Sequence, residues 1–135
     1  MESSLLEKAR ELLNRNLLTT TLSTVDKEYN VNVAVITVVE MVDDETILCA
    51  RFGAEQTYAN LKETGKGVFM VLVADEQGKK DGIRVYVRLA EDLTEGPYYE
   101  RIKARLQATP YRDFPLKNCL VFKITGIAPI STLKR

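Results

Sequence analysis

The sequence contains no histidine among its 135 residues. Histidine is the commonest general base and the commonest transition-metal ligand of proteins, so its absence excludes Ser–His–Asp and Cys–His catalysis. There are only two cysteines, Cys49 and Cys119, and they stand far apart in the sequence. This pair cannot supply the ligands of a typical zinc site, so zinc chemistry is not expected either.

Both cysteines stand in short apolar segments, LCA and NCL, that are typical of strands. The N-terminal sequence MESSLLEKARELL contains acidic residues and lacks the basic region and the small-residue cleavage site of a signal peptide. These features predict a cytoplasmic protein, in which disulfides are rare. Because free cysteine is usually buried, we expect two buried free thiols.

An excess of charge is also lacking, since Lys+Arg and Asp+Glu number 19 each. Without a basic stripe, the chain is not expected to bind nucleic acid. No run approaches the roughly 18 consecutive apolar residues of a membrane span, so no membrane partner is expected. The Gly-rich G-x-G-x-x-G fingerprint that receives a pyrophosphate is missing as well.

The length and composition suit one domain over residues 1–135, because 45% of the residues are hydrophobic and can form a sizeable core. An amphipathic helix is expected from Ser3 to about Asn14, and further helices over Ala54–Thr64 and Pro97–Leu106. Alternating or continuous apolar runs predict six strands, over Leu17–Val25, Val31–Met41, Thr46–Arg51, Val68–Ala74, Ile83–Leu93 and Leu116–Ile127. These elements predict an α+β, mostly β fold: an antiparallel barrel with helices packed outside it.

The segment Thr46–Val73 carries the clearest functional pattern. A short apolar strand ends in small and polar residues, a tight loop follows, and a short helix leads into a second apolar strand. This arrangement can present backbone N–H groups together with hydroxyl, amide and guanidinium groups to an anion. The residues by themselves therefore predict an α+β domain with a candidate anion site.

Four segments carry a further pattern: NVNVAVIT at Asn30–Thr37, ARFGAEQTYANLKETGKGVFMVLV at Ala50–Val73, VRLAEDLTEGPYYERIKARL at Val87–Leu106 and FPLKNCLVFKITGIAPI at Phe114–Ile130. They resemble the FMN-binding split β-barrel family, the group related to pyridoxamine 5'-phosphate oxidase. Their order and spacing extend the resemblance over nearly the whole chain. It implies a six-stranded antiparallel split β-barrel with short flanking helices, which forms a homodimer and binds FMN at the subunit interface.

The resemblance also implies which residues hold the flavin. The matching positions lie on the second and third strands and in the loop and helix start that follow, with one further cation on the last strand: Ala34, Val35, Ile36, Thr37, Arg51, Phe52, Gln56, Thr57 and Lys117. The family often has basic residues where Gln56 and Thr57 stand in this chain. The positive partner of the phosphate is therefore left to another residue, with Arg51, Lys62, Lys117 and Arg84 as the candidates.

Several of these residues also have ordinary structural explanations. Thr37 and Thr57 are common residue types for a strand and a helix start, Arg51 for a solvated strand end, and Phe52 for a core or an interface.

Two long apolar stretches, Val31–Val42 and Val68–Ala74, exceed what one small barrel covers by itself, which also favours a homodimer.

In a flavoprotein the cofactor performs the redox chemistry and the protein positions and tunes it, so the lack of histidine is no obstacle. The resemblance implies an FMN-dependent oxidoreductase or a small electron-transfer flavoprotein, acting on an unknown small molecule or redox protein. The substrate-phosphate site of true pyridoxamine-phosphate oxidases is missing, and that activity is not expected. The alternative is a non-enzymatic barrel that has lost flavin and binds another ligand or partner.

Overall fold

The computed structural model describes residues 3–15 and 19–130. Three helices and seven strands lie within these ranges. The helices are α1 (Ser3–Asn14), α2 (Glu55–Thr64) and α3 (Pro97–Gln107), and the strands are β1 (Thr19–Val25), β2 (Val31–Ile36), β3 (Val39–Met41), β4 (Thr46–Arg51), β5 (Lys66–Ala74), β6 (Lys80–Leu93) and β7 (Asn118–Pro129). The mostly β architecture with flanking helices is confirmed.

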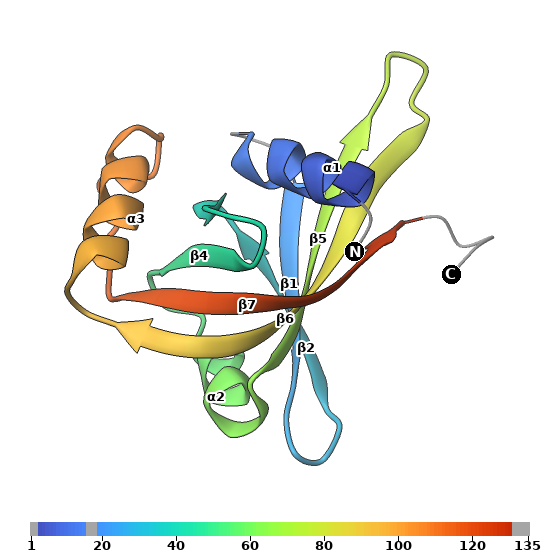
Figure 1. Cartoon of the computed structure of the whole chain (residues 1–135). Helices are drawn as coiled ribbons and strands as arrows, with labels where there is room; N and C mark the ends of the chain where they lie inside the picture. The colour runs from blue at the N-terminus through green and yellow to red at the C-terminus, as the bar shows by residue number, and fades with distance from the viewer. Residues whose placement is uncertain (1–2, 16–18, 131–135) are drawn as a thin grey trace.

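The seven strands form one antiparallel sheet in the order β2-β1-β5-β6-β7-β4-β3. β6 and β7 are long and curved, so the part of the sheet that contains β1, β2 and β5 crosses the part that contains β4 (Figure 1). β6 pairs with β7 with two register shifts, between Tyr86 and Val87 and between Leu89 and Glu91. Such irregularities increase local twist and bend a strand, and the curled sheet is the result.

The single strand expected over Val31–Met41 is wrong, because the structure divides it into β2 and β3. β2 pairs with β1 and β3 pairs with β4, and these two strands form opposite edges of the sheet. Thr37 and Val38 carry the chain from one edge to the other. Because VNVAVITVVEM is apolar along its length, the sequence does not indicate where the pairing partner changes. The sheet therefore has seven strands rather than six.

Most of the hydrophobic core lies on the inner face of the curled sheet. Residues of β5 and β6 alternate, so Phe69, Val71, Ile83 and Val85 are fully buried while their neighbours face outward. Ala9, Leu12 and Leu13 of α1 close the same cluster. A second cluster joins α3 to the outer side of β4 and β7 through Leu48, Ile102, Leu106, Cys119 and Val121. α1 and α3 are thus fixed by apolar contacts, and α2 packs against β1, β2 and β5.

Both cysteines are free and buried, as expected. They lie on neighbouring strands, but Cys49 pairs with Leu120 and Cys119 with Ala50 in the β4–β7 register. Successive residues of a strand point to opposite faces, so one thiol belongs to the inner core cluster and the other to the cluster under α3. Burial raises the pKa of each thiol to about 12, which keeps both protonated at neutral pH.

The other expected elements are confirmed with shifted ends. α2 ends where predicted, at a left-handed Gly65 with a φ of 73°, and Pro97 occupies the first turn of α3. β7 begins at Asn118, two residues later than expected, and Leu17 at the start of the first predicted strand lies outside the described residues. Among the helices that the structure describes, none is both long and apolar enough to cross a membrane.

Candidate functional site

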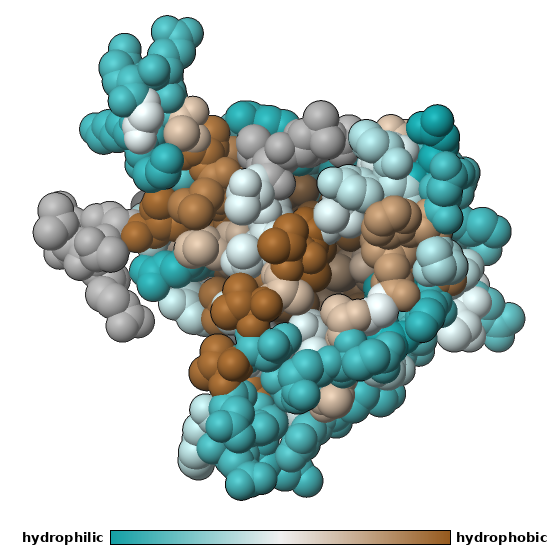
Figure 2. Space-filling model, turned by 180° about the vertical axis from the view of Figure 1, so that it is seen from behind, coloured by the Kyte–Doolittle hydropathy of each residue, from teal (hydrophilic) through white to brown (hydrophobic). Residues whose placement is uncertain are grey.

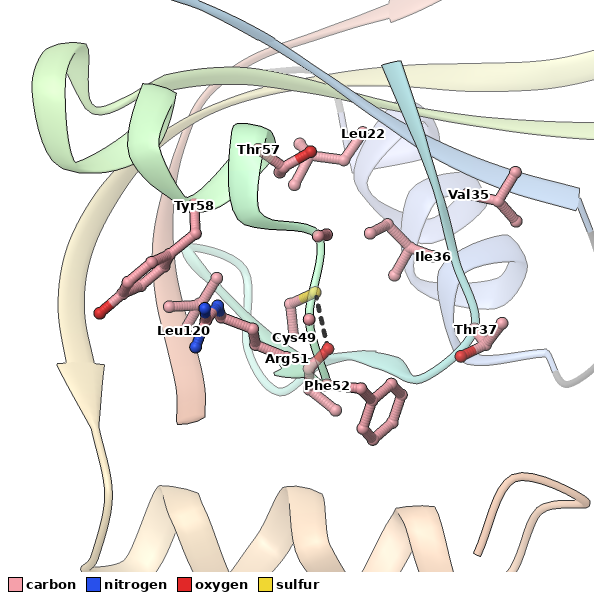
Figure 3. Close-up of a pocket in the computed structure, with 13 residues that line it drawn as sticks. Leu22, Val35, Ile36, Thr37, Cys49, Arg51, Phe52, Thr57, Tyr58 and Leu120 are labelled. Carbon is pink, nitrogen blue, oxygen red and sulfur yellow. Dashed lines mark hydrogen bonds between the residues drawn. The ribbon is translucent and has the colours of Figure 1, made fainter. Parts of the chain in front are cut away.

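A pocket opens at the split between the two edges of the sheet, where β2 faces the end of β4 and the start of α2 (Figure 3). Its volume is about 170 Å³. The lining comes from β1, β2, β4, the loop before α2, the first turn and a half of α2, and β7: Leu22, Val35, Ile36, Thr37, Cys49, Ala50, Arg51, Phe52, Gly53, Ala54, Thr57, Tyr58 and Leu120. Most of these side chains are apolar, and the polar ones stand at the margins.

The alternation of β2 places its residues on different sides of the pocket wall. Ile36 points toward Cys49, whereas Val35 projects to the opposite side of the strand (Figure 3). Val35 is accordingly 72% exposed. Phe52 stands across from Thr37 near the mouth (Figure 3), and its ring meets the ring of Phe114 edge to face at 5.4 Å. The pocket therefore has an apolar interior, and the exposed Val35 marks the side on which its mouth opens.

Arg51 is held by several partners at one side of the pocket. Its guanidinium donates to Asn118 Oδ1 at 2.5 Å and to Glu55 Oε1 at 2.9 Å, and lies 3.7 Å from the centre of the Tyr58 ring. Its side chain is only 10% exposed. The Nε atom is buried and has no hydrogen-bond partner among the described residues. Arg51 thus brings a fixed positive charge, paired with the exposed Glu55, to the side of the pocket.

Asp92 ties this arrangement together from β6. Its carboxylate accepts hydrogen bonds from the Tyr58 hydroxyl, from Lys62 at 3.2 Å and from the Asn118 amide at 2.8 Å. Burial raises the pKa of Asp92, but the hydrogen bonds from Tyr58 and Lys62 outweigh burial and hold this pKa below its ordinary value of 3.8. The hydrogen bond to Asp92 in turn raises the pKa of the Tyr58 phenol. At neutral pH the pair is therefore an ionised carboxylate and a protonated phenol.

A second polar group lies at the first turn of α2. The Asn32 amide donates to Thr57 Oγ1 at 2.9 Å, and Thr57 is buried, with 4% of its surface exposed. Because the oxygen already accepts this bond, the Thr57 hydroxyl proton remains available to another acceptor. Next to this pair, Gln56 donates to Asn60, and the Asn60 amide donates to Thr24. The side chains of this group are all neutral.

The start of α2 leaves its first N–H groups without a side-chain cap. Ala54 occupies the N-cap position in the left-handed conformation, with a φ of 57°, and makes no side-chain cap hydrogen bond. Non-glycine residues adopt this conformation rarely, and they do so disproportionately at functional sites. The uncapped N–H groups and the helix dipole give this end of the pocket a partial positive charge. An anion placed beside Thr57 would meet both.

Of the nine site residues predicted from the sequence, six line this pocket: Val35, Ile36, Thr37, Arg51, Phe52 and Thr57. The other three do not. Ala34 is the residue before Val35 on β2 and does not line the pocket. Gln56 is exposed and donates a hydrogen bond to Asn60. Lys117 is exposed immediately before β7, where its backbone N–H donates to the Arg51 carbonyl at 2.8 Å.

The sequence analysis missed Asn32, Tyr58, Asp92 and Asn118, which hold the polar groups around the pocket. Each acts across a long separation in the chain: 25 residues separate Asn32 from Thr57, and 34 separate Tyr58 from Asp92. Only the pairing of the strands brings them together. An asparagine in the otherwise apolar run of β2 is the one feature of the sequence that could have drawn attention to Asn32.

No protein-family model and no curated protein sequence matches the chain. Solved structures do. The crystal structure of an FMN-binding protein from Syntrophomonas wolfei subsp. wolfei is 66% identical, with a TM-score of 0.92, over 97% of this chain and 89% of that one. HupZ from Group A Streptococcus is 23% identical with a TM-score of 0.72, over 93% of this chain and 94% of that one.

A third similar structure is that of an F420 reductase, which is 19% identical with a TM-score of 0.62, over 88% of this chain and 94% of that one. At such identities the last two structures concern the fold alone. The first is a near relative over almost its whole length. From the curled seven-stranded sheet, the pocket at its split and this relative, we conclude that the chain belongs to the FMN-binding split β-barrel family, the group related to pyridoxamine 5'-phosphate oxidase.

Proposed function

We propose that the protein binds FMN in the pocket between β2, β4 and α2, and that it acts as a flavin-dependent oxidoreductase or a small electron-transfer flavoprotein. The observation that carries this proposal is the Asn32–Thr57 pair at the uncapped first turn of α2. It leaves one hydroxyl proton and several N–H groups for an anion, at the edge of an otherwise apolar pocket. The relative with 66% identity is described as an FMN-binding protein, which supports the same ligand.

The residues present suit the parts of FMN. Ile36, Leu120 and Phe52 offer apolar walls to a flat ring system. Thr57 and the N–H groups of the first turn of α2 would hold the phosphate, and charged acceptors form stronger hydrogen bonds than neutral ones. Arg51 would contribute its positive charge through space from the side of the pocket, since its guanidinium nitrogens are buried or bonded to Asn118 and Glu55. When bound, FMN supplies transfer of hydride or single electrons, and the chain's own residues bind and orient it.

A second copy of the chain would complete the site. A pocket of about 170 Å³ is smaller than the roughly 300–1,000 Å³ of typical ligand sites. Next to its mouth, Val31, Val33 and Val35 project from β2 with 70%, 60% and 72% of their surfaces exposed. Figure 2, seen from behind, shows apolar side chains gathered in the middle of the molecule and polar ones around them. We therefore propose a homodimer that buries the outer side of β2 and covers the pocket mouth.

The alternative, a barrel that binds another ligand, rests on one observation. Among the described residues, no cationic side chain donates a hydrogen bond to Thr57 or its polar neighbours, since their side-chain partners are amides and hydroxyls. The two proposals differ in a simple property of the purified protein. A flavoprotein is yellow and releases FMN on denaturation, whereas the alternative gives a colourless protein that does not turn yellow when FMN is added.

We also propose that the protein is located in the cytoplasm. Its two free, buried thiols are in keeping with that reducing compartment.

The phosphate site is tested by Thr57→Val, which keeps the shape of the side chain and removes the hydroxyl. FMN affinity should fall by about 1–2 kcal/mol, roughly tenfold, because one hydrogen bond to a charged group is lost. Thr109→Val is the matched control, since Thr109 is also buried but lies outside the pocket. Quenching of flavin fluorescence measures both affinities. Equal FMN affinity in Thr57→Val and the unmodified protein would place the phosphate elsewhere.

A further inference from the structure

The two members of the Arg51–Glu55 ion pair are exposed to very different degrees. The Arg51 side chain is 10% exposed, whereas the Glu55 side chain is 74% exposed. Arg51 lines the pocket (Figure 3), and Glu55 does not belong to the lining. The pair therefore joins a buried charge of the pocket to a charge that stands in solvent.

Arg51 is fixed by contacts other than the one with Glu55. Its guanidinium donates to Asn118 Oδ1 and lies over the ring of Tyr58, an arrangement in which the ring attracts the cation. Both of these neighbours are bonded in turn to the Asp92 carboxylate. Arg51 would consequently keep its position if Glu55 moved away.

Glu55 is held much more weakly. Within the described residues, its carboxylate accepts one hydrogen bond, from Arg51 Nη2 at 2.9 Å, and forms no second ion pair. An ion pair with an exposed partner is weak, because water screens the charges and an ordered long side chain loses entropy. Glu55 is thus the member of the pair that a competing anion can displace.

The junction between β4 and α2 brings this carboxylate to the proposed phosphate site. Arg51 is the last residue of β4 and Glu55 is the first residue of α2, with residues 52–54 between them. Glu55 therefore belongs to the same helical turn as Thr57 and the uncapped N–H groups. Among the described residues, Glu55 is also the one acid that contacts the Arg51 guanidinium. Its carboxylate neutralises part of the positive charge that a phosphate at this turn would meet.

We infer that Glu55 is a specificity-determining residue, which lowers the preference of the site for FMN over riboflavin by neutralising Arg51. A phosphate at the first turn of α2 competes with the Glu55 carboxylate for the same cation, so FMN binds at the expense of the ion pair. Riboflavin brings no negative charge and leaves the ion pair intact. The inference rests on the proposed function, because it requires a flavin phosphate at this turn.

Glu55→Gln tests the inference, since it nearly preserves the size of the side chain and removes its charge. FMN and riboflavin are each titrated into the flavin-free, full-length protein at low salt, and quenching of flavin fluorescence gives the affinities. We expect Glu55→Gln to bind FMN about threefold to fivefold more tightly than the unmodified protein does, the scale of one exposed ion pair. The riboflavin affinity should stay unchanged.

Glu11→Gln is the matched control, because Glu11 forms an exposed ion pair with Arg15, also four residues away, and lies outside the pocket. It should leave both affinities unchanged. A second comparison introduces Glu55→Gln into a protein that already carries Arg51→Gln. There the FMN affinity should no longer rise, because the charge that Glu55 neutralises is gone. Thermal melting checks that all variants fold.

The outcomes separate this inference from the proposed function. If FMN binds more tightly than riboflavin but Glu55→Gln leaves the FMN affinity unchanged, the inference alone is overturned. An equal gain for FMN and riboflavin, or the same gain in the Arg51→Gln background, would overturn it too, since Glu55 would then not act on the phosphate through Arg51. Equal affinities for FMN and riboflavin in the unmodified protein and in Glu55→Gln would contradict the phosphate site itself, and the inference with it.

Discussion

Asp92 is the residue on which the polar groups beside the pocket converge. It accepts hydrogen bonds from Tyr58, Lys62 and Asn118, and Asn118 in turn accepts one from Arg51. Through Asn118 and Tyr58, this carboxylate fixes two of the three neighbours of the Arg51 guanidinium, the third being Glu55. The position of the one buried positive charge at the pocket therefore depends on an acidic residue of another strand.

Asp92→Asn should lower the free energy of unfolding at pH 7 by about 1–3 kcal/mol, because hydrogen bonds to a charged group become neutral ones. The pKa of Asp92 is lower in the folded protein than its ordinary value of 3.8. Its stabilising contribution is thus complete above about pH 4 and is lost as the pH falls through the folded pKa. The difference between the two proteins in urea unfolding should accordingly shrink below pH 4.

Asp113→Asn is the control for this measurement, since Asp113 is exposed and makes no ion pair within the described residues. Its free energy of unfolding should match that of the unmodified protein both at neutral pH and below pH 4. A constant difference between Asp92→Asn and the unmodified protein from pH 7 to pH 3 would show that the Asp92 charge does not hold this network.

At the scale of single residues, the sequence could predict the pocket's apolar wall and Thr57 but not the hydrogen bonds around them. Val35, Ile36 and Phe52, which the family resemblance names as flavin contacts, all line the pocket, and their contact with flavin stays a prediction. The partners of Asn32 and Asp92 could not be deduced locally, because each acts on a residue of α2 from a different strand. Arg51 was expected to face solvent or a phosphate, and its contacts with Tyr58 and Asn118 depend on the same distant pairing.

Among the elements, the β5–β6 hairpin depends on a close approach of two backbones. An added Cβ at Gly82 would lie 2.0 Å from the carbonyl oxygen of Val71, and this oxygen cannot move without breaking the ladder. Gly82→Ala should therefore lower the free energy of unfolding by about 2–3 kcal/mol, the cost of overpacking a well-packed site.

The control is Gly53→Ala, where an added Cβ has no heavy atom within 4 Å. Chemical denaturation of the two variants measures the comparison directly. Unfolding midpoints of Gly82→Ala and Gly53→Ala that coincide with that of the unmodified protein would mean that β5 and β6 are not as close at Gly82 as described.

Helices and strands could be predicted better than their pairing. α2 and α3 have sharp local boundaries, since Gly65 ends one and Pro97 begins the other. The alternation of Ile83, Val85 and Val87 identifies the inner face of β6. The division of Val31–Met41 into two strands has no such local cause, because it follows from the sheet edge at which each half finds its partner. The pocket lies at this division, so its shape could not be deduced from the sequence.

At the scale of the whole molecule, the proposed homodimer accounts for the exposed valines of β2. Val33→Asp places a charge in the middle of this row, where 60% of the residue is exposed in a single copy. Folding of one copy should therefore be little affected, whereas burial of an unpaired charge between two copies is costly. We expect the mass in solution to fall from a dimer to the 15.2 kDa of one chain.

Ala104→Asp is the control, because Ala104 is exposed on α3, away from β2. It should leave the mass unchanged in light scattering at micromolar concentration. If the unmodified protein is already monomeric, or if Val33→Asp remains dimeric, then the outer side of β2 does not form the proposed interface.

The central claim is that this pocket holds the phosphate of FMN at the first turn of α2. Titration of the flavin-free protein with FMN and with riboflavin, which lacks only the phosphate, tests it most directly. We predict that FMN binds at least tenfold more tightly than riboflavin, because bound riboflavin leaves Thr57 and the uncapped N–H groups without an anion. Equal affinities for FMN and riboflavin would contradict the claim.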